Sequence, residues 1–319
     1  MRLLPYALCL GALLACAPRI DPVRVAVTRS EAQLARGEYL ARAVMACGAC
    51  HSERDWTKVN GPVKDGAEFA GSGDLAREER YSEKFSFAAP NLTPHHLGNW
   101  TDGEVARAIV FGQRPDRRGL FPYMPYFEYR EALARDDLSA VVAFLRTLPP
   151  QPGPPTVEAR FPMPGFVLNR FPEERPLREK APAPGETDYG KYLTEIAGCL
   201  ACHTEADKRG AFTGPRYGGG REFKVPAPGA GVVRSANLTP DPETGLGAWT
   251  REQFIARFKS ASLDAVRGQD VPPGGFNSVM PYWAWARMRE EDLGAIFDFL
   301  RSLPPEKRRF AKHSSDPPR

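Results

Sequence analysis

Two CxxCH motifs constrain this chain more than any other feature of its sequence. The first runs from Cys47 to His51 and the second from Cys199 to His203. On a helical turn, residues i and i+3 share a face, so both cysteines of a motif can hold one porphyrin edge while the histidine lies under the iron. Covalent haem attachment needs such a pair of thiols and one imidazole. The motifs therefore predict two haem c groups, with His51 and His203 as axial iron ligands and with four attachment residues: Cys47, Cys50, Cys199 and Cys202.

Other uses of paired cysteines fit this pattern less well. Zinc ribbons place their CxxC pairs about 15 to 20 residues apart, whereas about 150 residues separate the two pairs here. A thioredoxin-like redox CxxC is flanked by a βαβ pattern, and the flanking sequence here is helical. Two disulfides, the usual reading of four cysteines in an exported chain, leave the histidine after each pair unexplained. We therefore favour haem attachment over these three alternatives.

The segments around the two motifs form an internal repeat. Each repeat contains, in the same order, a GxYL segment, CxxCH, NLTP, WT, MPY and a closing LRxLPP segment. Apart from CxxCH, these matching segments begin at Gly37 and Gly190, Asn91 and Asn237, Trp100 and Trp249, Met124 and Met280, and Leu145 and Leu300. The repeat predicts two tandem haem domains, over residues 30–150 and 185–305, followed by a polar tail over residues 306–319.

Capping patterns and apolar spacing predict helices in both repeats. Thr101 with Glu104, and Thr250 with Gln253, form capping boxes that open short helices containing residues 105–109 and 254–258. Closing helices are expected over residues 137–148 and 292–303, each stopped by a double proline. Because no segment alternates convincingly between apolar and polar residues, the expected fold class is all-α.

A proline-rich connector joins the two predicted domains. Residues 149–184 contain 11 of the 32 prolines, so we expect residues 151–184 to be extended. Apolar side chains such as Phe161 and Phe171 would pack this connector on a domain as a strap. The glycine-rich residues 214–231 lack a phosphate-loop pattern and are expected to form a plain loop.

Two methionines are candidates for the sixth iron ligands. Only Met124 and Met280 occupy equivalent positions in the repeat, and each is followed by a proline that excludes helix there. A single methionine beside aromatic residues would be better explained as core filler, but its repetition favours iron ligation. His95 and His96 are the main competitors. Asp241 and Pro242 replace them in the second repeat, which favours solvated loop histidines.

Trp100 and Trp249 stand where the capped helices begin. An indole N–H can donate a hydrogen bond to a haem propionate, but the indole is also a large apolar body. The sequence is therefore compatible with either role for these two residues, contact with a haem propionate or packing in the core.

The first residues resemble an export signal. A positive start and an apolar run over residues 3–17 are typical of a signal peptide, and the run is too short to span a membrane. Leu13-Leu14-Ala15-Cys16 resembles a lipobox, so we predict a signal over residues 1–17 with Cys16 as lipidation site; cleavage after Ala17 is the alternative. The expected location is the periplasmic side of a bacterial membrane, lipid-anchored, or otherwise the soluble periplasm. A net charge of +4 from 43 basic and 39 acidic residues is too small to indicate nucleic-acid binding.

Together these motifs resemble the cytochrome c subunits of membrane-bound bacterial dehydrogenases for alcohols, aldehydes and sugar acids. The resemblance covers roughly residues 31–305. It implies class I cytochrome c folds, with His51 and Met124 as one axial pair and His203 and Met280 as the other. In that family the subunit takes electrons from the catalytic subunit of the dehydrogenase and passes them to ubiquinone or an oxidase. For this chain we expect a dehydrogenase subunit as electron donor and an oxidase or another cytochrome as acceptor. Many such subunits carry three CxxCH motifs, whereas this chain carries two.

An electron carrier and a haem enzyme differ in whether both axial positions of each iron are filled by protein ligands. A dihaem peroxidase needs one iron that can open a coordination position, whereas a plausible methionine is present in both repeats. The sequence therefore favours an electron-transfer protein without a substrate of its own, with a dihaem peroxidase as the alternative.

Overall fold

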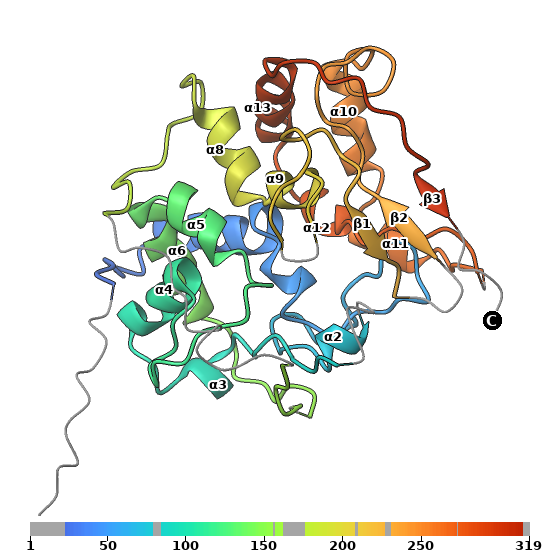
Figure 1. The fold of residues 1–319 in the computed structure, drawn as a ribbon. Coiled ribbons are helices and arrows are strands. Elements are labelled where there is room, and N and C mark those ends of the chain that lie inside the picture. Colours follow the sequence, from blue (N-terminus) through green and yellow to red (C-terminus); the bar gives the residue numbers. More distant parts are fainter. Residues whose placement is uncertain are drawn as a thin grey trace, which may run out of the picture.

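A computed structural model describes residues 23–78, 84–155, 157–161, 176–207, 210–226, 231–272 and 274–314. The predicted signal, Cys16 and Phe171 lie outside these residues. Helices dominate the described chain, and their bounds are α1 Glu31–Tyr39, η1 Leu40–Val44 (π-helical), η2 Cys47–Ala49 (3₁₀), α2 Leu75–Glu78, α3 Pro94–Leu97, α4 Asp102–Phe111, α5 Tyr126–Ala132, α6 Arg135–Leu145, α8 Tyr189–Ile196, α9 Cys199–Cys202, α10 Arg251–Lys259, α11 Leu263–Arg267, α12 Tyr282–Trp285 and α13 Glu290–Arg301 (Figure 1).

The predicted helix starts are confirmed at α4 and α10. Thr101 and Thr250 each accept a hydrogen bond from the third helical residue, and Glu104 and Gln253 bond back to the cap. The closing helices α6 and α13 begin two residues before their predicted starts and end at Leu145 and Arg301, before their predicted ends. They end early because the residue before a proline disfavours helical geometry, which pushes the last residues before each double proline into a turn.

Each repeat contains the same close crossing between its first and last long helices. A Cβ added to Gly37 in α1 would lie 1.9 Å from the carbonyl oxygen of Ala140 in α6. A Cβ added to Gly190 in α8 would lie 2.1 Å from the carbonyl oxygen of Ala295 in α13. Only glycine allows backbones to approach this closely, so the repeated glycine fixes the angle at which the CxxCH segment enters each repeat.

A small antiparallel sheet departs from the all-α expectation. Its strands are β1 Glu222–Lys224, β2 Val232–Arg234 and β3 His313–Ser314, in the order β1-β2-β3. The plain-loop prediction for residues 214–231 is therefore wrong at β1, and part of the polar tail is paired in the sheet. Strands of three residues or fewer are too short to show alternation, so the sequence pattern does not indicate them.

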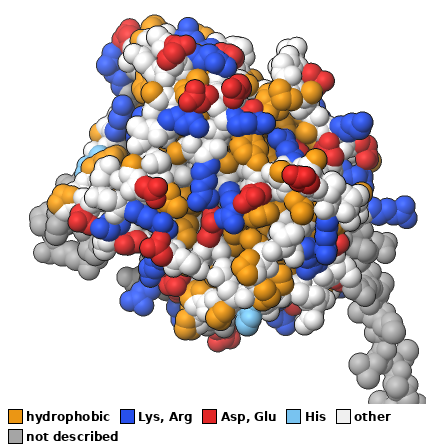
Figure 2. Space-filling model, turned by 180° about the vertical axis from the view of Figure 1, so that it is seen from behind, with side chains coloured by type: hydrophobic (Ala, Val, Ile, Leu, Met, Phe, Trp, Pro, Cys, Tyr) orange, Lys and Arg blue, Asp and Glu red, His pale blue; other side chains and the backbone are white. Residues whose placement is uncertain are grey.

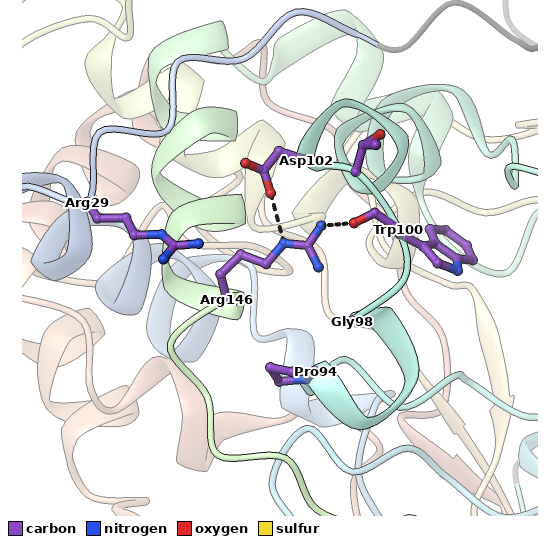
Figure 3. A pocket seen from close by; sticks show the side chains of 7 residues that line it. Arg29, Pro94, Gly98, Trp100, Asp102 and Arg146 are labelled. Atoms are coloured by element: carbon purple, nitrogen blue, oxygen red, sulfur yellow. Dashed lines mark hydrogen bonds and ion pairs between the residues drawn. The ribbon is translucent and has the colours of Figure 1, made fainter.

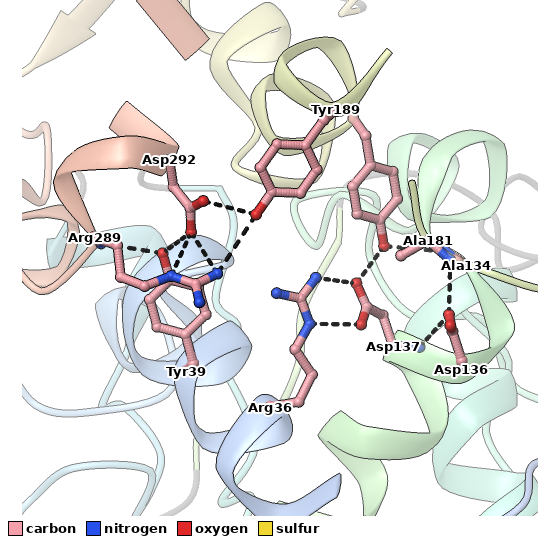
Figure 4. Close-up of polar contacts among 10 residues, drawn as sticks. Arg36, Tyr39, Ala134, Asp136, Asp137, Ala181, Tyr189, Arg289 and Asp292 are labelled. Carbon is pink, nitrogen blue, oxygen red and sulfur yellow. Dashed lines mark hydrogen bonds and ion pairs between the residues drawn. The ribbon is translucent and has the colours of Figure 1, made fainter. Parts of the chain in front are cut away.

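The two repeats pack on one another through a reciprocal set of hydrogen bonds (Figure 4). The Tyr192 hydroxyl of the second repeat donates to Asp137 of the first at 2.6 Å, and the Tyr39 hydroxyl of the first donates to Asp292 of the second. Each hydroxyl also accepts a backbone N–H from the opposite repeat, that of Ala134 or of Arg289. Both carboxylates are almost fully buried. Because each contact has its counterpart at the repeat-equivalent position, the interface is approximately twofold.

Figure 2 shows Lys and Arg side chains interspersed with Asp and Glu over one face of the molecule, between apolar side chains. This mixture agrees with the small net charge of +4. Within the described ranges, no helix combines the length and apolarity that crossing a bilayer requires.

Candidate haem sites

In both CxxCH motifs the structure brings the two cysteines and the histidine into one helical turn. The first motif forms η2, in which the His51 amide donates to the Cys47 carbonyl at 3.0 Å. The second forms α9, in which the His203 amide donates to the Cys199 carbonyl at 2.8 Å. The predicted i, i+3 placement of the thiols is thus present twice.

A left-handed residue starts each turn. Ala46, before Cys47, has φ 49°, and Gly198, before Cys199, has φ 72°. This conformation interrupts the preceding helix and redirects the chain, which separates the CxxCH turn from η1 and α8. For Ala46 it costs about 1 kcal/mol or more in backbone strain, so the packing around the first motif must hold it.

The imidazoles of His51 and His203 are oriented in the same way. Each Nδ1 lies 2.8 Å from a backbone carbonyl oxygen, that of Pro90 for His51 and that of Ala236 for His203. Burial lowers the pKa of both histidines, against the opposing effect of these hydrogen bonds. A neutral ring that donates through Nδ1 presents the lone pair of Nε2, which is the arrangement of a metal-ligating histidine.

The repeated NLTP segment explains how these carbonyls are held. Asn91 Oδ1 accepts from the amide and the hydroxyl of Thr93, and Asn91 Nδ2 donates to the Gln151 carbonyl at 2.8 Å. Asn237 repeats all three bonds, to Thr239 and to the Glu306 carbonyl. The segment is therefore an Asx-turn tied to the chain just beyond the double proline. Pro90 and Ala236 immediately precede it, so it fixes the acceptors that orient both histidines.

Met124 and Met280 each begin a tight turn. In both, the amide two residues later donates to the methionine carbonyl at 2.8 Å. Pro125 (φ −79°, ψ 48°) and Pro281 (φ −80°, ψ 62°) sit at the centres, close to an inverse γ-turn. Both methionine side chains are half-buried, and Met124 packs on the same apolar core as Cys47. Iron ligation by Met124 and Met280 stays a prediction.

The residues present fit haem in two respects. The first is the pair of oriented, neutral imidazoles beside paired thiols. The second is Arg130 in α5, whose Nε and Nη2 atoms are buried without a hydrogen-bond partner among the described residues. Its Nη1 pairs with Glu131, and a haem carboxylate would satisfy the two remaining buried donors. Arg130 was missed from the sequence because alanine occupies the equivalent position in the second repeat.

The competing histidines and the two tryptophans lie nearer the surface. His95 and His96 are exposed in α3, which agrees with the expected solvated histidines. Trp100 is half-buried with its ring centroid 5.9 Å from that of His96, and Trp249 is 38% exposed. Propionate contact by Trp100 and Trp249 stays a prediction.

A pocket of about 480 Å³ adjoins Trp100 (Figure 3). Arg146 crosses it and donates to Asp102 Oδ1 at 2.8 Å and to the carbonyls of Leu97 and Trp100. The equivalent Arg301 donates to the Leu246 and Gly247 carbonyls. These arginines tie each closing helix to the turn before its capped helix, which gives the repeated LRxLPP arginine a structural role.

Comparison with known proteins agrees with this chemistry. The chain is 26% identical to the fructose dehydrogenase cytochrome subunit of Gluconobacter japonicus over 85% of the chain and 52% of that protein. It is 27% identical to the cytochrome c subunit of a quinone alcohol dehydrogenase from Gluconobacter oxydans, over 86% of the chain and 55% of that protein. The chain is similar to cytochrome c subunits of bacterial dehydrogenases. The predicted resemblance is thereby confirmed, and these relatives are named as cytochrome subunits and not as catalytic ones.

A third relative matches over more of its own length. A dihaem c-type cytochrome of Cereibacter sphaeroides is 27% identical over 89% of the chain and 90% of that protein. By contrast, the chain spans little more than half the length of the two dehydrogenase subunits. No family model matches the chain.

Proposed function

We propose that the chain is a dihaem c-type cytochrome that carries electrons and has no substrate of its own. The observation that carries this proposal is the repeated site: a CxxCH turn whose histidine donates through Nδ1 to a fixed carbonyl. Haem supplies one-electron chemistry at its iron when it is bound. The chain supplies the thiols that hold it, the neutral imidazole that faces the iron, and an apolar surrounding that excludes water.

The two repeats are two tandem class I cytochrome c domains in this proposal. The equivalent glycine crossings, capping boxes and NLTP turns support it. The connector serves as a strap: Phe161 stacks on Phe121 with ring centroids 4.9 Å apart and also lies beside Phe87. Phe121 lies three residues before Met124, so the strap would support the first methionine loop.

Met124 and Met280 complete the two iron coordination spheres in this proposal. Six-coordinate irons are closed to peroxide, which is why electron transfer is favoured over peroxidase activity. The test is turnover of hydrogen peroxide with a reduced donor. We expect rates far below those of an enzyme, and enzyme-like turnover would replace the carrier with a dihaem peroxidase.

The partners proposed are a dehydrogenase subunit as donor and an oxidase or another cytochrome as acceptor. Similarity to dehydrogenase cytochrome subunits supports the donor. The proposed location is the periplasmic side of the membrane, through lipid on Cys16. Copurification from native membranes in mild detergent tests the donor, and labelling with a radioactive fatty acid in wild type and Cys16→Ser tests the anchor. An unlabelled wild-type protein would leave the soluble periplasm as its location.

A further inference from the structure

The loop that carries Met280 is held from outside its own repeat. Asn277, three residues before Met280, is 2% exposed and accepts a hydrogen bond from the Asn60 amide at 2.8 Å. Its Nδ2 donates to the Lys58 carbonyl at 3.0 Å. Asn60 and Lys58 belong to the loop that follows His51 in the first repeat. The amide side chain of Asn277 therefore bridges the first haem motif's loop to the approach to Met280.

Backbone pairing extends this contact. The Val59 amide donates to the Gln269 carbonyl at 2.9 Å, and the Val271 amide donates to the Thr57 carbonyl at 2.8 Å. Asn277 Oδ1 also accepts from the Ser278 amide, and Ser278 Oγ in turn accepts from the Met280 amide at 3.2 Å. A continuous series of hydrogen bonds thus leads from the first repeat to the backbone of Met280.

The far side of the Met280 turn is also attached to the first repeat. Trp285 Nε1 in α12 donates to the Val44 carbonyl at 3.0 Å, three residues before Cys47. Trp283 is 1% exposed and shares an apolar cluster with Ala46 and Ala49. Ala46 directly precedes the first CxxCH motif, and Ala49 lies within it. Met280 therefore lies between two segments, before and after it in sequence, that are attached to residues flanking the first CxxCH motif.

The equivalent loop of the first repeat is arranged differently. Phe127 occupies the position of Trp283 and is 44% exposed. Before Met124, the ring of Phe121 packs on the rings of Phe87 and Phe161, at centroid distances of 4.8 and 4.9 Å. These three phenylalanines all precede the second repeat in sequence. The residues that lead to Met124 are therefore supported within the first repeat, although α5, which follows Met124, packs on α8 of the second repeat. The residues that lead to Met280 are held by hydrogen bonds from the first repeat.

We propose that the first repeat sets the ligation of the second haem, with Asn277 and Trp285 as positioning residues for Met280. This inference rests on the proposed function, because it takes Met280 as the iron ligand. A loosened loop would spend more time with the methionine off the iron, so an external ligand would bind that haem more tightly. The Met124 site would not respond.

The test uses two backgrounds, each of which leaves one methionine. Met124→Leu leaves only the Met280 site and Met280→Leu only the Met124 site, read by the weak Met-to-iron band of the oxidised protein and by imidazole titration. In the Met124→Leu background, we expect Asn277→Ala and Trp285→Phe each to raise imidazole affinity at the remaining Met site about tenfold, or about 1.4 kcal/mol. In the Met280→Leu background, neither should change the Met124 band or its displacement.

Asp270→Asn is the matched control, because it removes an exposed ion pair with Lys58 from the same loop pair. It should leave both sites unchanged. Trp285→Phe keeps an aromatic ring at this position and removes the N–H donor together with part of the indole, so it decides the question if Asn277→Ala does not fold. If Met280→Leu leaves the oxidised spectrum unaltered, the proposed ligand is wrong. If Met280→Leu removes its band but Asn277→Ala and Trp285→Phe leave imidazole affinity unchanged, or weaken both sites equally, the positioning role is wrong.

Discussion

The close helix crossing of the second repeat predicts a measurable cost for Gly190→Ala. The added Cβ would lie 2.1 Å from the Ala295 carbonyl oxygen and 3.2 Å from Phe299 Cβ. Carbon–oxygen contacts are normally about 3.3 Å or longer, so α8 and α13 would have to separate by about 1.2 Å. Overpacking of this kind costs about 3 kcal/mol, and alanine recovers about 1 kcal/mol through its better helix propensity. We expect a net loss of about 2 kcal/mol in the free energy of unfolding.

Urea denaturation of wild type and variant, followed by far-ultraviolet circular dichroism, measures this loss. Gly268→Ala is the control, because Gly268 has φ −75° and an added Cβ would meet only ordinary contacts, the nearest at 3.6 Å. It should change stability by less than about 0.5 kcal/mol. Gly37→Ala should behave like Gly190→Ala, since its Cβ would lie 1.9 Å from the Ala140 carbonyl oxygen. If Gly190→Ala is neutral or stabilising, the crossing is not as close as the structure has it.

Three further outcomes are expected. Burial raises the pKa of Tyr192 and of Tyr39 above 10, so the stability that these hydroxyls contribute is present below pH about 10 and is lost as the pH rises above it. Tyr192→Phe should lower the free energy of unfolding at pH 7 by about 1–3 kcal/mol and make that free energy fall less steeply at alkaline pH. An unchanged alkaline slope would contradict the hydrogen bonds assigned to Tyr192 between the repeats. Met124→Leu should remove one of two Met-to-iron bands in the oxidised spectrum, and two surviving bands would exclude Met124 as a ligand. Arg130→Gln should lower the reduction potential of one haem, because a buried positive charge disfavours the oxidised iron. If a redox titration shows both potentials unchanged, Arg130 does not lie close to either haem.

Much of each site could be predicted because its signals are local. The CxxCH spacing fixes a single turn, and the capping boxes need only residues three apart. Repetition supplied the two candidate sixth ligands, since Met124 and Met280 stand out from the other methionines only through their equivalent positions, and their iron ligation stays a prediction. The resemblance to dehydrogenase cytochrome subunits rested on the same repeated order of motifs.

The contacts between the repeats could not be predicted in this way. Tyr39 and Asp292 are 253 residues apart in sequence, and nothing local distinguishes a tyrosine that pairs with a distant carboxylate from one that packs in its own core. Asn277 likewise reads as an ordinary loop residue until its partners at Lys58 and Asn60 are seen. The sheet was missed because β3 pairs with β2 from a tail whose composition indicates only polarity.

The number of covalently bound haems is the most direct test of the dihaem proposal. The protein would be produced in a host that attaches haem c, denatured, and measured for intact mass and for haem per chain. We expect two haems that stay with the denatured chain, and one haem in the Cys199→Ala, Cys202→Ala double variant, with the Met124 band retained. A wild-type chain that carries zinc or two disulfides and no covalent haem would contradict the account.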